Sequence, residues 1–305
     1  MRAYLFRRLV QSLYVVLGLS LLAFLILHLT GDPALVILPP YASAQEIAAF
    51  REKMGFNDPL YTQYLRFLGR ALQGDFGASF LQGAPALGLI LERMPATVEL
   101  TAAAIAFAVL LAVPAGMVAA LRKDRLLDYA SMLLALLGQS MPAFWLGLML
   151  LMFFSVKLDL LPVSGRGTLA HLILPAVTLG SFVAARIARL TRSEMLEVLG
   201  QDFVRTARAK GLTELAVVAK HAFKNSLVPV VTIVALELGT ILGGAVITET
   251  IFSWPGVGRL MVDSISERDF PVVQAGVFVI AVVFVAINLI VDVLYAYLDP
   301  RIRYT

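Results

Sequence analysis

The sequence predicts an all-helical membrane protein with six transmembrane helices and a helical segment outside the membrane between the first two. Of the 305 residues, 59% are hydrophobic and 15% are charged, whereas soluble domains have about 45–50% apolar and about 25% charged residues. The apolar residues gather in six long runs, and a membrane-spanning helix needs ~20 such residues. Basic residues cluster between alternate runs, as expected for a chain that crosses a membrane several times.

Each of the six runs is long enough to form a span. The expected spans are Leu9–Leu29, Thr97–Leu121, Tyr129–Val156, Leu169–Leu190, Leu227–Thr248 and Val272–Leu298. The fourth is the weakest, because Pro175 interrupts it and two arginines lie at its end. The first has a basic start, but its apolar run exceeds the ~7–15 residues of a signal-peptide core. We therefore expect a retained anchor.

Lysine and arginine predict the orientation. They concentrate at both chain ends and in the loops that follow the second and fourth runs, whereas acidic residues offset them in the short loops on the other side. This asymmetry places both termini in the cytoplasm. The formal charge of +4 and the pI near 9.4 then reflect membrane topology, and we expect no nucleic-acid partner.

Composition also excludes several chemistries. The chain has no cysteine, which rules out disulfides, thiolate metal sites and a cysteine nucleophile. The three histidines are scattered, so we expect no metal site. No phosphate-binding G-x-x-x-x-G-K-[ST] loop is present. Gly239 and Gly243 form a G-x-x-x-G pattern, which favours close helix packing over nucleotide binding.

The segment 30–95 between the first two runs has helix signals. Ser43 and Glu46 form a capping-box pattern for a helix that ends near Met54, before Gly55. Asp58 is expected to cap a second helix with Pro59 at its first position. That helix would end at Gly74 and place five apolar residues on one side: Tyr61, Tyr64, Leu65, Leu68 and Leu72. We expect this subdomain to lie on the bilayer or against a partner.

The stretch between the fourth and fifth runs is expected to face the cytoplasm. It is rich in helix-forming and basic residues, and Arg205, Arg208 and Lys210 precede Gly211. Because glycine interrupts the helical pattern there, the stretch predicts a helix–turn–helix.

Polar residues inside the runs suggest a pathway. Gln139 and Ser140, with Pro142, interrupt the third run, and either a pathway lining or a kink with satisfied polar groups explains them. Glu237 lies within the fifth run, where a charge costs roughly 2.5–3.5 kcal/mol or more. It either serves the pathway, where it meets a peptide's amino group or faces water, or it avoids lipid by pairing with an arginine or capping a helix. Near the span ends, Glu99 and Glu249 are more simply explained by pairing or capping.

The motifs together identify a family resemblance. Arg205-Thr206-Ala207-Arg208-Ala209-Lys210-Gly211-Leu212, followed by His221-Ala222-Phe223-Lys224-Asn225, resembles the coupling loop of ABC-importer permeases. Further matches are Gly31-Asp32-Pro33-Ala34, Asp58-Pro59-Leu60, Gly74-Asp75-Phe76-Gly77, Ser253-Trp254-Pro255-Gly256, Arg268-Asp269-Phe270-Pro271 and Asp299-Pro300-Arg301-Ile302-Arg303. The whole is similar to the dipeptide/oligopeptide branch, most of all to B-type dipeptide permease subunits. Glutathione and nickel permeases share much of this pattern.

The resemblance implies a type I ABC-importer permease fold and a function. The chain would be a subunit of an ATP-driven, binding-protein-dependent importer of dipeptides or oligopeptides, and not itself an enzyme. A second homologous permease would complete the pathway, two ATPases would bind ATP and Mg²⁺, and an extracytoplasmic binding protein would deliver the peptide. No cofactor is expected on this chain, and its location would be the bacterial inner membrane.

The resemblance also suggests roles for residues. The helix that includes residues 205–212 would dock on one ATPase, with its cations facing acidic groove residues. The turn at Trp254, Pro255 and Gly256 would close the extracytoplasmic end, although Trp254 could equally anchor the chain at the membrane interface. The expected division is 1–29 for the first span, 30–95 for the extracytoplasmic segment, 96–298 for the permease core with 192–226 as coupling loop, and 299–305 for the cytoplasmic tail.

Other functions remain as alternatives. A permease for glutathione or nickel fits the same motifs. An ion-coupled secondary carrier would need carboxylates near mid-membrane, and only Glu237 qualifies. An intramembrane hydrolase needs a nucleophile–base or paired-carboxylate arrangement, which the sequence lacks. A purely structural membrane subunit would tolerate changes at Gly211.

Overall fold

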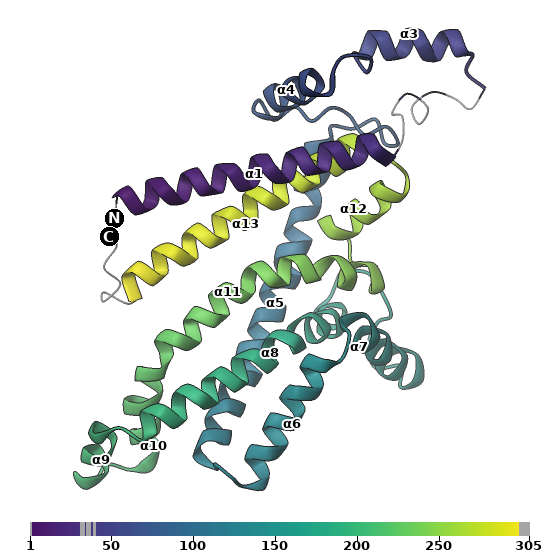
Figure 1. Ribbon diagram of the computed structural model, residues 1–305. Helices are drawn as coiled ribbons and strands as arrows, with labels where there is room; N and C mark the ends of the chain where they lie inside the picture. The colour runs from purple at the N-terminus through teal and green to yellow at the C-terminus, as the bar shows by residue number, and fades with distance from the viewer. Residues whose placement is uncertain (1, 31–33, 35–37, 39–40, 299–305) are drawn as a thin grey trace. The chain divides into compact units, whose positions relative to one another are not determined.

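A computed structural model describes residues 2–30, 34, 38 and 41–298 (Figure 1). The motif residues Gly31, Asp32 and Pro33, and the whole of 299–305 with its closing motif, lie outside the described residues. Almost all regular structure in the described part is helical.

The helices, in chain order, are α1 (Arg2–Thr30), α3 (Ala44–Met54), α4 (Leu60–Ala71), α5 (Ala86–Leu121), α6 (Leu126–Ser140), α7 (Ala143–Leu150), the π-helix η1 (Leu151–Lys157), α8 (Leu169–Leu199), α9 (Asp202–Ala209), α10 (Glu214–Ala216), the π-helix η2 (Val217–Ala222), α11 (Phe223–Ile251), α12 (Val257–Ser266) and α13 (Phe270–Leu298). They form two compact units. The first unit holds the described residues of 1–95 together with Gly256–Ala286. The second holds Ala96–Pro255 and the end of α13.

Several helices are long and apolar enough to cross a membrane. Among the described residues they are Ala86–Leu121, Leu169–Leu199, Glu214–Ile251 and Phe270–Asp292. A fifth span results if Leu126–Ser140 and Ala143–Lys157 are taken together. Helix α1 contributes a shorter apolar stretch, Val10–Ile26. The predicted multi-span helical architecture is therefore confirmed, whereas the count of six spans stays a prediction.

Proline acts differently in two of the predicted spans. The third span is broken, because its halves meet at an angle of 105° around Met141 and Pro142. In contrast, Pro175 lies inside α8 without ending it, so the expected interruption there is wrong. Pro175 lies within the second turn of its helix, where it removes a single backbone hydrogen bond. The helix also continues past the predicted end at Leu190 to Leu199.

In the first unit, α3 begins as predicted. The Ser43 hydroxyl accepts a hydrogen bond from the Glu46 backbone N–H at 3.3 Å, and the Ser43 N–H donates to the Glu46 carboxylate at 2.7 Å. The Ser43 hydroxyl also donates to the Glu46 carboxylate at 2.8 Å, and the two bonds that this carboxylate accepts, from the Ser43 backbone and hydroxyl, lower the pKa of Glu46. The helix ends at Gly55, whose φ of 71° suits a residue without a side chain.

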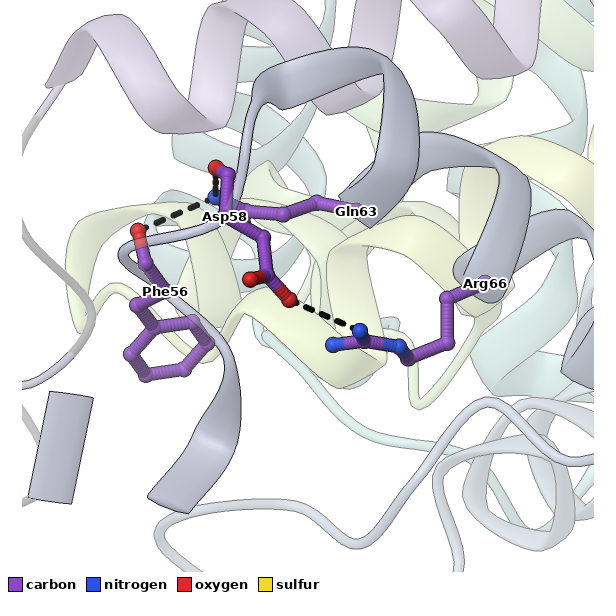
Figure 2. Close-up of polar contacts among 4 residues, drawn as sticks. All are labelled: Phe56, Asp58, Gln63 and Arg66. Atoms are coloured by element: carbon purple, nitrogen blue, oxygen red, sulfur yellow. Dashed lines mark hydrogen bonds and ion pairs between the residues drawn. The ribbon is translucent and has the colours of Figure 1, made fainter. Parts of the chain in front are cut away.

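Helix α4 differs from its prediction at its start. It begins at Leu60 after Pro59, and no side chain caps it. The Asp58 carboxylate instead accepts a hydrogen bond from Arg66 at 2.7 Å, as Figure 2 shows. The Gln63 amide donates to the carbonyls of Phe56 and Asp58 at 3.0 and 2.8 Å. The side chains of Gln63 and Arg66, in the first two turns of the helix, thus hold the preceding loop in place by hydrogen bonds.

Helix α4 packs within the first unit through Phe67 and Ala71 and leaves part of its predicted apolar side exposed. Phe67 and Ala71 are buried, whereas Tyr61, Leu65 and Leu72 are exposed. The helix ends at Ala71, and Gly74 instead forms a following turn with a φ of 79°. Phe67 is buried because it packs against two aromatic rings from other elements, Phe24 and Phe76.

An aromatic chain forms the core of the first unit. Phe24 of α1 lies 6.2 Å from Phe67, which lies 6.1 Å from Phe76, and Phe76 lies 5.3 Å from Phe278 of α13, as measured between ring centroids. The buried Asp269 fastens the loop after Phe76 to this core. Its carboxylate accepts hydrogen bonds from the Ser79 hydroxyl at 2.5 Å and from the Phe80 N–H at 3.1 Å.

Small residues let the helices of the second unit approach closely. A methyl group placed on Gly180 of α8 would lie 2.6 Å from the Ala104 carbonyl oxygen of α5. Similarly, one on Gly116 would lie 2.6 Å from the Ala188 carbonyl oxygen. At Gly243, in the predicted G-x-x-x-G pattern, no described atom lies within 4 Å of such a methyl group. Within this chain, close helix contacts therefore form at Gly116 and Gly180, whereas Gly243 has open space beside it.

This difference gives a matched test of packing. The substitution Gly180→Ala should destabilise the protein by about 1–3 kcal/mol, because backbone must move to admit the methyl group. Gly243→Ala should be neutral or stabilising, since alanine favours a helix. Thermal unfolding of the purified protein in detergent measures both, and equal unfolding temperatures for the two variants would contradict this packing.

Candidate functional site

A basic helix–turn–helix follows α8, as predicted. Helix α9 ends at Ala209, and Gly211 adopts a φ of 76°, in the left-handed region that favours glycine. The Thr213 side chain then accepts a hydrogen bond from the Ala216 N–H at 3.4 Å and starts α10. The turn thus depends on Gly211 for its backbone conformation.

Helix α9 is anchored through two small apolar side chains. Val204 and Ala207 are buried in a cluster with Met195 and Val198 of α8 and Val217 of η2. The other predicted coupling residues are exposed: Arg205, Thr206, Arg208, Ala209, Lys210, Gly211 and Leu212. The exposed apolar residues Phe203 and Leu215 lie on the same loop. The structure therefore places Ala207 on the anchoring side, apart from the others.

Two of the three cations are already paired within the loop. Arg208 donates to the Glu214 carboxylate at 2.6 and 3.1 Å, across the turn. This hydrogen bonding raises the pKa of Arg208. Arg205 lies 3.4 Å from Asp202 on the same helix. Within the described part of the chain, Lys210 has no such ion pair. Arg208 thus stabilises the turn through Glu214, and among these three cations Lys210 is the one whose charge is not paired within the loop.

A bidentate ion pair ties the start of α6 to α8. Arg192 donates to the two carboxylate oxygens of Asp128 at 2.6 and 2.7 Å, and Asp128 is 2% exposed. The backbone N–H of Asp124 donates to the same carboxylate at 3.1 Å. Because Arg192 lies about one turn before Met195 and two turns before Val198, the pair holds α6 to the part of α8 that anchors α9.

A pocket of about 450 Å³ opens at the break between α6 and α7. Gln139 and Ser140, both predicted pathway residues, line it together with Thr240 of α11. Leu179, Phe182 and Ile241 form part of its apolar wall. Its volume lies within the range of small-molecule sites, ~300–1,000 Å³. The structure therefore brings two of the three predicted pathway residues into one cavity.

The third predicted pathway residue, Glu237, lies beside this pocket but does not line it. It is 2% exposed and lies 2.9 Å from the Arg186 guanidinium. Pairing with an arginine, one of the explanations open for Glu237, is therefore observed, whereas its role in the pathway stays a prediction. Arg186 was noticed in the sequence only as a charge near the end of a span.

The predicted gate residue Trp254 is fully buried. Its indole N–H donates to the Ala96 carbonyl at 2.8 Å, and its backbone N–H donates to the Glu249 carbonyl at 2.8 Å. The interfacial-anchor alternative for Trp254 is therefore wrong, because an anchor exposes its ring to the membrane interface. Pro255 is partly buried, and Gly256 is buried and begins α12. The chain passes between the two compact units at Pro255 and Gly256.

The carboxylates near the span ends have partners. Glu99 accepts hydrogen bonds from Arg166 at 2.5 and 2.8 Å, and Thr97 donates to the buried Glu249 at 2.6 Å. The pairing expected for these residues is confirmed. Sequence analysis missed Asp128 and Arg192 as a pair, because both lie just outside the predicted runs Tyr129–Val156 and Leu169–Leu190. The two residues are 64 positions apart in the sequence, so no helical spacing relates one to the other.

Two sequence families match the chain. Residues 112–304 match the family described as binding-protein-dependent transport system inner membrane component, and residues 1–101 match the corresponding N-terminal family. The chain is 44% identical to the dipeptide transport system permease protein DppB of Alkalihalophilus pseudofirmus, with all of both chains covered. It is also 44% identical to the glutathione transport system permease protein GsiC of Escherichia coli, with 99% of each covered.

Solved structures show a similar fold. A structure of the MetNI methionine ABC transporter in an inward-facing conformation matches with a TM-score of 0.55 and 17% identity, over 69% of this chain and 96% of that chain. An amino acid ABC transporter matches with a TM-score of 0.53 and 15% identity, over 69% and 94%. These matches confirm the predicted permease fold.

The Asp128–Arg192 pair can be tested by charge removal. Asp128→Asn should destabilise the protein by about 1.5–3 kcal/mol, because it removes hydrogen bonds between charged groups and leaves Arg192 without its partner. The double variant Asp128→Asn with Arg192→Gln should recover part of this loss, since no unpaired charge remains. Thermal unfolding measures both variants, and a double variant that is less stable than Asp128→Asn would contradict the expected coupling.

Proposed function

Because the chain belongs to the family of binding-protein-dependent transport system inner membrane components, we propose that it forms half of the membrane pathway of an ATP-driven peptide importer. Membership makes it a multi-pass permease subunit of an ABC transporter and not an enzyme, and ATP hydrolysis belongs to separate subunits. The resemblance inferred from the motifs is confirmed.

The finer assignments are part of the proposal. A second homologous permease lies across the pathway, and two ATPases bind ATP and Mg²⁺. An extracytoplasmic binding protein delivers the solute, and the segment 30–95 faces that protein. Both termini lie in the cytoplasm, supported by the basic clusters on that side. The buried turn at Trp254, Pro255 and Gly256 lies at the extracytoplasmic end.

One observation supports the coupling role most directly. Helix α9 packs on α8 and η2 through Val204 and Ala207, while Arg205, Ala209, Lys210 and the turn at Gly211 remain exposed. A short helix held by one side and exposed on the other is suited to a groove in an ATPase. The exposed positive charge complements an acidic groove. Residues 205–212 except Ala207 are the proposed contact surface.

The proposed solute is a dipeptide or oligopeptide, supported by the dipeptide permease relative. Glutathione is the second candidate, because its permease relative is equally similar at 44% identity. Uptake of a labelled dipeptide into proteoliposomes that contain the complete transporter, with glutathione as competitor, separates them. Efficient competition by glutathione at equimolar concentration would favour the second candidate.

A crosslinking experiment tests the proposed function. The chain has no cysteine, so Ala209→Cys introduces a single thiol on the exposed side of α9. With a thiol-to-amine crosslinker in native membranes, we expect an adduct with an ATPase whose yield changes when nucleotide is added. Ala207→Cys is the matched control, because this position is 6% exposed, and it should give little adduct. Absence of an ATPase adduct at position 209, with the thiol labelled and uptake intact, would contradict the proposed contact surface on α9.

The turn at Gly211 gives a second prediction. No described atom lies within 4 Å of a methyl group placed there, so a substitution acts through backbone strain of roughly 1–2 kcal/mol. Gly211→Val should lower peptide uptake strongly while the protein still inserts in the membrane. Gly211→Asn should be milder, since asparagine tolerates this conformation. Uptake at equal membrane abundance measures both, and normal uptake with valine would instead indicate a purely structural subunit.

A further inference from the structure

A buried ion pair lies one helical turn from the pocket. Phe182 and Thr240 line the pocket, and Arg186 and Glu237 lie four and three residues from them on α8 and α11, respectively. Residues three or four apart share a face of a helix. Arg186 lies nearer than Phe182 to the end of α8, and Glu237 lies nearer than Thr240 to the start of α11. The loop that contains α9 joins these two helix ends. The pair thus adjoins the end of the pocket nearer to this loop.

The two charges of this pair differ in accessibility. The Arg186 side chain is 29% exposed, whereas that of Glu237 is 2% exposed. The guanidinium also stacks on the Phe182 ring, 4.4 Å from the ring centroid, and Phe182 lines the pocket. A solute in the pocket therefore lies next to a positive charge, while the compensating negative charge lies behind it.

Arg186 retains unused hydrogen-bonding capacity. An arginine has five N–H donors. Nη2 lies 2.9 Å from Glu237, yet Nε and Nη2 are both buried without a hydrogen-bond acceptor within the described residues, and Oε2 of Glu237 is likewise without a donor there. A carboxylate matches two such donors in a bidentate arrangement. A solute carboxylate would therefore satisfy groups that the chain leaves unsatisfied.

We propose that Arg186 binds the carboxylate of a small solute held in the pocket, and that Glu237 is a positioning residue. This inference rests on the proposed transport function. Glu237 neutralises and orients the guanidinium while the pocket is empty, which limits the cost of a charge in apolar surroundings. Phe182 holds the guanidinium plane next to the pocket. The ligand class is a small solute with a free carboxylate, such as a peptide with an unblocked C-terminus.

The test uses the complete transporter in nanodiscs without nucleotide. Ser140→Cys places a single reporter thiol of this chain in the pocket, and its reaction rate with a maleimide is followed on this chain by gel. The probes are dialanine and its C-terminal amide, which differ only in the carboxylate. Dialanine should slow the reaction and the amide should not. Uptake of labelled dialanine is measured in parallel, with ATP supplied, in proteoliposomes made from the same purified complexes.

Three further variants in this background identify the group responsible. Arg186→Gln should raise the dialanine concentration for half-protection about tenfold or more, because charged hydrogen bonds are lost. Arg189→Gln is the matched control, since it removes the same charge from an exposed site one turn away, and it should leave protection unchanged. The double variant Arg186→Gln with Glu237→Gln leaves no unpaired charge, so it should fold. Dialanine should still fail to protect its reporter thiol.

Each outcome separates the possibilities. Three results would overturn the inference: equal protection by dialanine and its amide, equal effects of Arg186→Gln and Arg189→Gln, or full protection in the double variant. Full protection in the double variant would also show that the ion pair is purely structural. If neither probe protects although dialanine is taken up, the inference fails alone. If the parent complex takes up no peptide, the proposed function fails with it.

Discussion

The second compact unit depends on the neutralisation of two arginines on α8. Arg186 and Arg192 lie on a helix that is largely buried, where an unpaired charge is costly. Glu237 of α11 pairs with the first, and Asp128 of α6 pairs with the second. Because each carboxylate comes from a different helix, neutralising the arginines requires α6 and α11 to pack on α8. Both α6 and α11 make extensive contacts with α8, and Figure 1 shows the three helices together in this unit.

This arrangement links the pocket to the exposed loop through one continuous helix. Leu179 and Phe182 line the pocket, and Met195 and Val198, on the same helix, anchor α9. A regular helix of this length transmits displacement along its axis, because its backbone hydrogen bonds resist bending. A partner that moves α9 would therefore act on α8 and on the ion pairs that it forms. Gly116 and Gly180 allow α5 to lie close to this helix. A side chain at either position would collide with a backbone carbonyl oxygen of the other helix.

Local signals predicted helix starts and turns well where the chemistry is contained in a few residues. The capping box at Ser43 and Glu46 and the left-handed turn at Gly211 are examples. Prediction failed where a distant side chain competed for the same group. Asp58 pairs with Arg66 and does not cap its helix. In the same way, Phe67 of α4 is buried through contacts with Phe24 and Phe76, which sequence spacing could not reveal. Pattern analysis considers neighbours in sequence, whereas these choices depend on neighbours in space.

The sequence by itself determined the helical membrane class, the approximate positions of the spans, the break near Pro142 and the family, because hydrophobic run length, glycine and proline act locally and the motifs cover most of the chain. Only the tertiary structure decided which charges meet. Glu237 faces Arg186, Asp128 faces Arg192, and Trp254 is buried against the Ala96 carbonyl. These contacts join residues that are about 50 to 160 positions apart, and the physical requirement to satisfy buried charges and donors operates on packed helices.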